Sequence, residues 1–344
     1  MKKPMGQSVS ELLRKAFRSP DFSRLLIFAV MFIATAILQR NFFTASSWVR
    51  NLNSFAPLIL MTMGQAIIII SGGLDLSVGN ALSLYTVLLT TFMVEGDPIT
   101  GAFAIVLTFI AAMVIGVING IGMGYFRIPA VIATYATSFI WLGISLFIRP
   151  TPGGDTVAWF QAFYRIRFIE GAPEVLGMIE RVIPPSLVLI LIGVALWYVV
   201  SRTRTGRYIY AVGSDEESAY QSGISTAGVK IRASMLNHVF VFLAALYFVG
   251  QNQTGDARMG DPLTLRAVAS ALVGGIALMG GRGSVYFAII GALIFSFVSK
   301  LIFFANIPNA YQTLFGGLII ILAIAASQFV ALHNRASKEE TTLS

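Results

Sequence analysis

Long apolar stretches separated by short polar segments follow one another along almost the whole chain of 344 residues. A bilayer core about 30 Å thick needs roughly 20 apolar residues per helix, and the pattern provides ten candidate segments of this kind. We therefore expect an all-α integral membrane protein with about ten transmembrane helices. The predicted spans are 25–38, 56–71, 77–94, 101–124, 128–148, 184–201, 231–250, 267–279, 285–304 and 310–332.

Composition and motifs exclude several classes of function. Only 12% of the residues are charged, against about 25% in soluble domains. The net charge of +8 does not indicate nucleic-acid binding, because the basic residues gather at the ends of apolar segments, where they set topology. There is no cysteine, and the two histidines, His238 and His333, are far apart, which argues against a metal centre. No Walker, HExxH or GxSxG motif is present, so we predict no catalytic or metal-binding residue.

The basic residues also predict an orientation. Ten spans place both termini on one side, and most Lys and Arg residues outside the spans fall on that side, so both termini are expected in the cytoplasm. The predicted parts are a basic segment 1–24, a transmembrane domain 25–332 and a tail 333–344. The basic N-terminal segment and the Ala-Thr-Ala sequence at 34–36 are compatible with a signal peptide. The apolar run continues past that sequence, so a retained first helix is the simpler interpretation.

The stretch SGGLDLSVGN, residues 71–80, places glycines and Asp75 between two apolar runs. A charge at the bilayer centre costs about 2.5–3.5 kcal/mol on insertion scales. We therefore expect this turn at the cytoplasmic ends of the second and third spans. Gly72 and Gly73 would supply unusual backbone angles, and Asp75 or Ser77 would cap the third span. The alternative is a gate or a contact at the inner mouth of a transport path.

Neutral polar side chains inside or near the apolar runs suggest a path for a neutral polar solute. Protons or ions would normally require intramembrane acidic or basic residues, whereas a neutral solute needs hydroxyls and amides. Any single residue of this kind is better explained by an interhelical hydrogen bond, which contributes about 0.6 kcal/mol. Only the whole set of these residues, taken together, predicts a transport path. The candidate path residues are Gln65, Asn119, Thr134, Tyr135, Thr137, Ser138, Asn237 and His238.

Two glycine patterns indicate packing and a possible repeat. Gly116, Gly120 and Gly124 recur every four residues, a spacing that lets two helices approach closely. Residues 69–84 and 277–293 share an apolar run, a Gly-Gly break, a Ser-Val pair and a second apolar run. Since transporters are often built from repeated halves, this similarity suggests an internal repeat.

Four segments, in order and at similar spacing, resemble the ribose-type sugar permeases, which are membrane subunits of bacterial ABC importers. They are NFFTASSWVRNL (41–52), SGGLDLSVGNALSL (71–84), TRTGRYIYAVGSDEESAYQSGIS (203–225) and GGIALMGGRGSVYFAIIGALI (274–294). The resemblance extends over roughly residues 41–331, nearly the whole predicted membrane domain.

The resemblance implies a permease in the bacterial inner (plasma) membrane that works as a homodimer or heterodimer. Its partners would be an ABC ATPase subunit inside and a periplasmic sugar-binding protein outside. ATP would be used by the partner subunit, and no cofactor is expected on this chain. The loop 202–230 would then contain the segment that couples the two subunits. The implied coupling residues are Gly213, Asp215, Glu216, Glu217, Ser218 and Gly223.

One departure from the family leaves the substrate open. The run LTLRAVASA carries Arg266 where the family usually has an acidic residue nearby, so neither the sugar nor the dimer symmetry is assigned. We expect a subunit that translocates a sugar or a similar small polyhydroxylated solute. The alternative is an ion-coupled secondary transporter, for which only Asp75 and His238 could be the coupling residues. A third class is a membrane scaffold or receptor without transport.

Overall fold

The computed structural model describes residues 20–164, 184–308, 311, 314–315 and 317–318. In this part of the chain every regular element is a helix, apart from two isolated β-bridges. The helices are α2 (Pro20–Leu38), α3 (Ala45–Ile70), α4 (Val78–Phe92), α5 (Pro98–Gly124), α6 (Ala130–Ile148), α7 (Ala158–Tyr164), α9 (Pro185–Arg202), α10 (Arg204–Ser214), α11 (Glu216–Gln221), α12 (Thr226–Asn252), α13 (Asp261–Val273) and α14 (Val285–Phe304).

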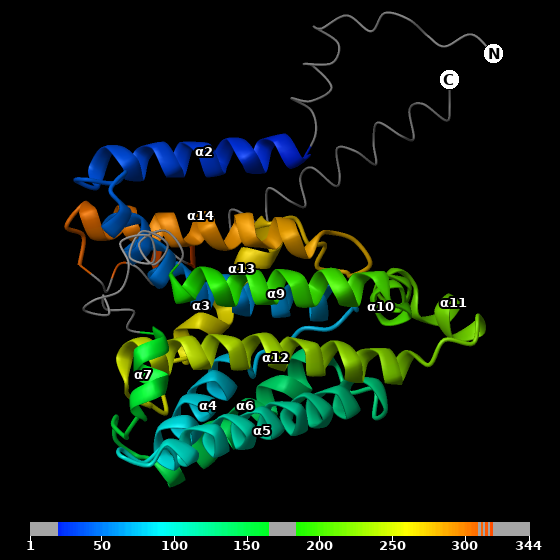
Figure 1. Ribbon diagram of the computed structural model, residues 1–344. Coiled ribbons are helices and arrows are strands. Elements are labelled where there is room, and N and C mark those ends of the chain that lie inside the picture. The colour runs from blue at the N-terminus through cyan, green and yellow to red at the C-terminus, as the bar shows by residue number, and fades with distance from the viewer. Residues whose placement is uncertain (1–19, 165–183, 309–310, 312–313, 316, 319–344) are drawn as a thin grey trace, which may run out of the picture.

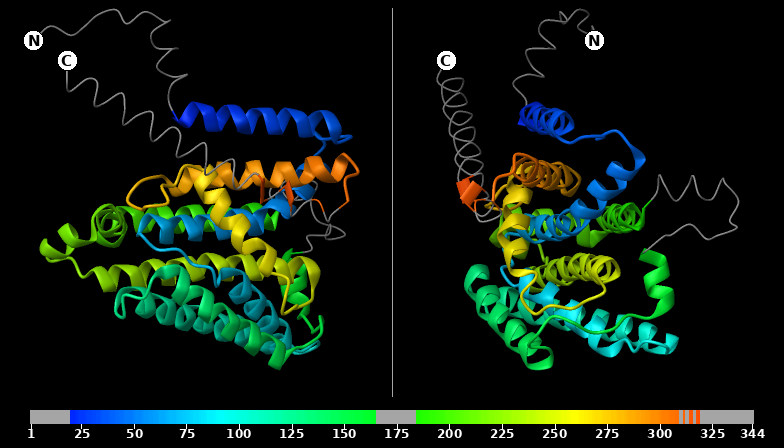
Figure 2. Two further views of the ribbon diagram at one scale, coloured as in Figure 1. Left: turned by 180° about the vertical axis from the view of Figure 1, so that it is seen from behind. Right: turned by 90° about the vertical axis from the view of Figure 1, so that its left-hand side faces the viewer.

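The long helices lie side by side, with α2 next to α14 on one side and α5 and α6 on the opposite side (Figure 1). Helix α3 is central, since 89% of its most apolar window is buried against 22% for α6. The short helices α10 and α11 lie together at one end of the bundle, and Figure 2 shows the same arrangement from behind. The outer helices therefore keep broad apolar faces for lipid.

Six helices among the described residues are long and apolar enough to span a membrane, namely α3, α5, α6, α9, α12 and α14. The prediction of an all-helical membrane protein is confirmed, while ten spans and cytoplasmic termini stay predictions. Segment 310–332 falls almost entirely outside the described residues, as do tail 333–344 and most of segment 1–24.

Two predicted spans differ most from the helices of the structure. Helix α3 begins at Ala45, because the Thr44 hydroxyl accepts a hydrogen bond from the backbone N–H of Ser47 at 3.3 Å and caps a polar first turn. The span expected at 267–279 is instead the 13-residue helix α13, which starts earlier and ends before Gly274. Beyond it lies a turn in which several glycines have positive φ, so the helix cannot continue there.

The glycine spacing in α5 allows close helix packing, as predicted. Side chains added at Gly116, Gly120 or Gly124 would collide with the backbone of α12. These glycines bring α12 against α5, and α12 in turn packs on α3 and α4. Helix α12 is thereby fixed at the centre of the bundle beside α3.

Helices α4 and α13 are short and meet at their N-terminal ends. The backbone N–H of Gly79 donates to the Thr264 hydroxyl at 3.1 Å, and the backbone N–H of Gly260 donates to the Ser83 hydroxyl at 2.9 Å. Each helix thus supplies an acceptor for a free N–H group of the other. This exchange lets two helices start inside the bundle, where irregular backbone is surrounded by protein and not by lipid.

Candidate functional site

Asp75 lies in the segment between α3 and α4 and is fully buried. One carboxylate oxygen, Oδ1, accepts hydrogen bonds from the backbone N–H of Ser77 at 2.8 Å and from its hydroxyl at 2.7 Å. The carboxylate therefore fixes the backbone just before α4, although Ser77 itself makes no side-chain cap.

The second carboxylate oxygen of Asp75, Oδ2, faces α12. The Asn237 amide donates to it at 3.1 Å, and His238 Nε2 lies 3.1 Å away. The other ring nitrogen of His238, Nδ1, lies 2.9 Å from the Tyr85 hydroxyl on α4. A single carboxylate thus joins the α3–α4 segment to α12.

Asn119 on α5 extends this network. Its amide nitrogen donates to the Ser77 hydroxyl at 2.8 Å, and its carbonyl oxygen accepts from Thr137 on α6 at 2.7 Å. Nearby, the Thr134 hydroxyl of α6 accepts from the backbone N–H of Leu76 at 2.9 Å. We call Asp75, Ser77, Tyr85, Asn119, Asn237 and His238 the Asp75 cluster. All six residues are buried.

The cluster lies deeper than the topology predicted. Asn237 and His238 are near the middle of the 27-residue helix α12, so Asp75, which contacts both, lies level with the middle of α12 and not with its end. The chain reverses at Gly72, where φ is 83°, and then runs back into the bundle without helical structure. The insertion cost of the charge is offset by the hydrogen bonds that surround it.

Five of the eight candidate path residues belong to this network or touch it, and three do not. The amide atoms of buried Gln65 have no hydrogen-bond partner among the described residues. Tyr135 is 56% exposed on the outer face of α6, and the Ser138 hydroxyl donates only to the backbone carbonyl of Tyr135. Tyr85 was missed, because a tyrosine in an apolar helix looks like an ordinary packing residue.

Further buried polar atoms in the central helices lack partners in the described part of the chain. An unsatisfied buried polar atom costs about 1–3 kcal/mol and calls for an explanation. Helices α3, α4, α12 and α13, which pack together, carry most of them. Among them are atoms of Thr62, Gln65, Asn80, Ser234, Asn237 and Ser270.

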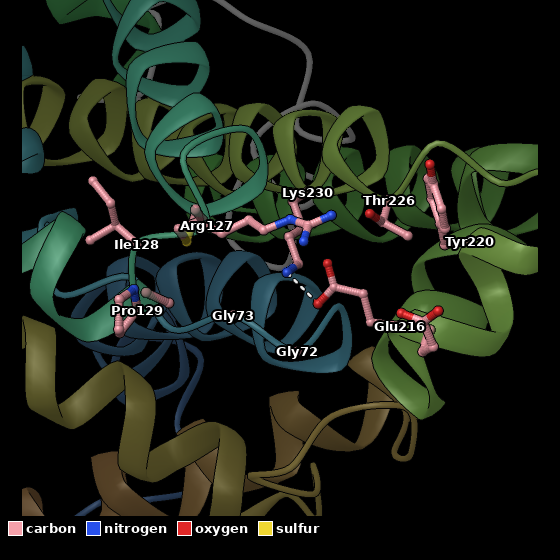
Figure 3. A pocket seen from close by; sticks show the side chains of 12 residues that line it. Gly72, Gly73, Arg127, Ile128, Pro129, Glu216, Tyr220, Thr226 and Lys230 are labelled. Carbon is pink, nitrogen blue, oxygen red and sulfur yellow. Dashed lines mark hydrogen bonds and ion pairs between the residues drawn. The ribbon is translucent and has the colours of Figure 1, made fainter.

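A separate pocket of ≈ 410 Å³ lies where α11 faces the α5–α6 turn (Figure 3). Gly72, Gly73, Glu216 and Glu217 are among the residues that line it. Lys230 at the start of α12 binds Glu216 at 2.6 Å across the pocket. The four residues predicted to form one turn at the inner mouth are therefore found in two places. Gly72 and Gly73 line the pocket, whereas Asp75 and Ser77 belong to the buried cluster.

The expected coupling residues lie in and around α10 and α11. Asp215 caps α11, because its carboxylate accepts from the backbone N–H of Ser218 at 3.0 Å and from the Ser218 hydroxyl at 2.8 Å. These bonds, the backbone one first, lower the pKa of the Asp215 carboxyl. Gly223, with φ at 80°, follows the end of α11. No cluster of three or more metal-ligand side chains occurs among the described residues.

Long apolar helices around a buried polar cluster are typical of a multi-pass membrane protein. The family model described as "Branched-chain amino acid transport system / permease component" matches residues 47–324, and the chain belongs to this family. It is therefore a transport subunit of the inner membrane and not an enzyme.

Curated relatives carry the name "Autoinducer 2 import system permease protein LsrC". The protein of Yersinia pseudotuberculosis serotype O:3 (strain YPIII) is 27% identical over 306 residues, covering 86% of this chain and 81% of the relative. That of Yersinia enterocolitica serotype O:8 / biotype 1B (strain NCTC 13174 / 8081) is 28% identical over 306 residues, covering 86% and 79%. No solved structure matches significantly.

Proposed function

We propose that this chain is the membrane-spanning subunit of an ATP-driven importer for a sugar or similar small polyhydroxylated solute. A periplasmic binding protein would deliver the solute, and a separate ABC ATPase would bind and hydrolyse ATP. A second permease, either a copy or a homologue, would complete the transport path. This chain itself would bind no cofactor.

The Asp75 cluster is the observation that carries this proposal. Its amides donate hydrogen bonds to the Ser77 hydroxyl and to the Asp75 carboxylate, and a solute rich in hydroxyl groups could replace those bonds one at a time. The relatives named as autoinducer 2 import permeases favour import over export.

The test is uptake into proteoliposomes that contain this chain with its ATPase, permease and binding-protein partners. The probes are radiolabelled pentoses and hexoses, with leucine as the comparison because of the family description. We expect ATP-dependent accumulation of at least one sugar and none of leucine. Sugar uptake by this chain without the ATPase would overturn the proposal, and uptake of leucine alone would overturn the solute class.

An ion-coupled transporter is the second candidate, because the two residues that could couple ions, Asp75 and His238, lie in direct contact at 3.1 Å. An imposed pH gradient across vesicles without ATP separates the two mechanisms. Accumulation driven by that gradient and abolished by a protonophore would favour ion coupling. We expect the gradient alone to drive no uptake.

A further inference from the structure

The helices α10 and α11 are attached to both sides of the Asp75 cluster. We propose that Gly213, near the end of α10, is the positioning residue through which a displacement of these helices reaches Asp75. The inference rests on the proposed function, because the partner ATPase would supply the displacement. It adds the route by which that displacement changes contacts in the Asp75 cluster.

The first attachment is a junction of backbone segments at Gly213. A side chain at this position would collide with the carbonyl oxygen of Ile70, the last residue of α3, and with the backbone N–H of Gly281. The same N–H of Gly281 donates to the Ile70 carbonyl at 2.9 Å. Three chain segments thus meet with no side chain between them, so α10 cannot shift toward α3 without moving it.

Both Gly-Gly breaks of the suggested repeat lie at this junction. A side chain at Gly280 would meet the backbone of Gly72 and the carbonyl oxygen of Gly213. On the other face, the Ser214 and Tyr210 hydroxyls of α10 donate to the Gly281 and Gly283 carbonyls at 3.4 and 3.1 Å. The end of α10 therefore contacts the turn after α3 and the turn before α14 at once.

The short path from this junction to Asp75 is stiffened by hydrogen bonds. Backbone N–H groups of Gly72 and Gly73 donate to the Ile69 and Ile68 carbonyls at 2.9 and 3.0 Å. The Ser71 hydroxyl donates to the Ile68 carbonyl at 2.7 Å. Asp75 follows within a few residues, so a displacement of Ile70 is carried into the segment that holds the carboxylate.

The second attachment runs through α12. Glu216 of α11 binds Lys230 at 2.6 Å, and Asn237 and His238 follow about two helical turns later on the same helix. Opposite, the pocket separates α11 from the α5–α6 turn at Arg127 (Figure 3). The helices α10 and α11 are thus tied to the carboxylate and to its α12 partners, but leave open space toward α5 and α6.

These attachments lead to a specific consequence. When α10 and α11 move, the α3–α4 segment is pushed through Gly213 while α12 is pulled through Lys230. The two sides of the contact between Asp75 and Asn237 then shift relative to each other. A side chain at Gly213 would force the end of α10 away from Ile70 and Gly281, so it should remove this junction and uncouple the cluster from the ATPase.

Thiol labelling tests this route directly, because the chain has no cysteine of its own. Leu74→Cys places a half-buried reporter beside Asp75. Its labelling rate by a water-soluble maleimide is compared in the assembled complex without nucleotide and in the ATP-bound state. We expect the two rates to differ by about tenfold, within the usual range of coupling between two sites. Gly213→Ala should abolish the difference, whereas Gly143→Ala, a helical glycine with open space around it, should preserve it.

Charge exchange tests the second attachment. Glu216→Lys and Lys230→Glu should each weaken the labelling difference, and the double variant should restore it. Copurification of the ATPase with each variant shows that the complex still assembles. An unchanged nucleotide-dependent difference in Gly213→Ala overturns this inference while wild-type uptake leaves the proposed function intact. Absence of ATP-dependent uptake in the wild-type complex overturns the proposed function itself.

Discussion

A single carboxylate in this membrane domain is stabilised by the donors around it. Asp75 receives hydrogen bonds from Ser77 through one oxygen and from Asn237 through the other, with His238 at 3.1 Å. Burying a charge without such partners costs several kcal/mol, whereas a paired and hydrogen-bonded charge is tolerated. Asp75 is therefore as much a structural connector of α4 and α12 as a candidate transport residue, and two substitutions separate these roles.

Asp75→Asn keeps an acceptor oxygen for Ser77 and removes the charge that faces His238. We expect the fold to persist while ATP-dependent uptake falls by about tenfold or more, equivalent to at least ~1.4 kcal/mol. Asp75→Ala instead leaves buried donors without an acceptor and should lower the free energy of unfolding by about 3–5 kcal/mol. Vesicle uptake and thermal unfolding measure the two effects. Normal uptake by Asp75→Asn would restrict Asp75 to its structural role.

The Asp215 cap of α11 should withstand mild acid. Hydrogen bonds from Ser218 lower the Asp215 pKa from its ordinary value of 3.8. Because the folded pKa lies below the unfolded one, the stabilisation is present above the unfolded value and is lost only as pH falls through the folded one. Hydrogen exchange of the Ser218 amide should therefore keep its protection between neutral pH and about pH 5, after correction for the intrinsic rate. Asp215→Ala should lose that protection, and Asp215→Asn should retain it.

At the scale of elements, the sequence predicts what periodicity and length determine. The apolar runs locate α5, α6, α9 and α14 well, because a helix in lipid must be both long and apolar. Helix α13 was misplaced because glycines with positive φ, not loss of hydrophobicity, end it. The polar start of α3 was missed because a helix that packs on protein tolerates polar residues there. Hydrophobicity indicates whether a helix is surrounded by lipid or by water. It does not predict the ends of helices that are surrounded by protein.

The glycine face of α5 gives a prediction at this scale. Gly120→Ala would push a methyl group into the backbone of Ile231, so we expect a loss of about 1–3 kcal/mol in stability. Gly122→Ala is the matched control on the same helix, since its nearest neighbour is the Ala133 methyl group at 3.5 Å. The control should be neutral or slightly stabilising, because alanine favours helix more than glycine does. Thermal unfolding in detergent should rank the two variants in this order; equal stability would contradict close α5–α12 packing.

At the scale of the whole molecule, the sequence predicts the members of the site better than their arrangement. Amides and a histidine inside apolar runs are unusual enough that the pattern of residues alone selects Asn119, Asn237 and His238. Their meeting with Asp75 depends on a chain reversal at Gly72 that brings the following segment back into the bundle. The similar Gly-Gly breaks likewise gave no sign that they touch each other beside Gly213. Such contacts join residues distant in sequence, and local patterns carry no information on them.

The orientation of the whole protein leads to the last prediction, which single cysteines can test because the native chain has none. The distribution of basic residues predicts that α11 lies in the cytoplasm and the α4–α5 turn outside. Glu95→Cys lies exposed in that turn, and Ser222→Cys lies exposed just after α11. A membrane-impermeant maleimide should label Glu95→Cys in spheroplasts and Ser222→Cys only after permeabilisation, with the cysteine-free chain as the blank. The reverse pattern would place α10 and α11 outside, where no ATPase could reach them, and would contradict both the orientation and the coupling route through Gly213.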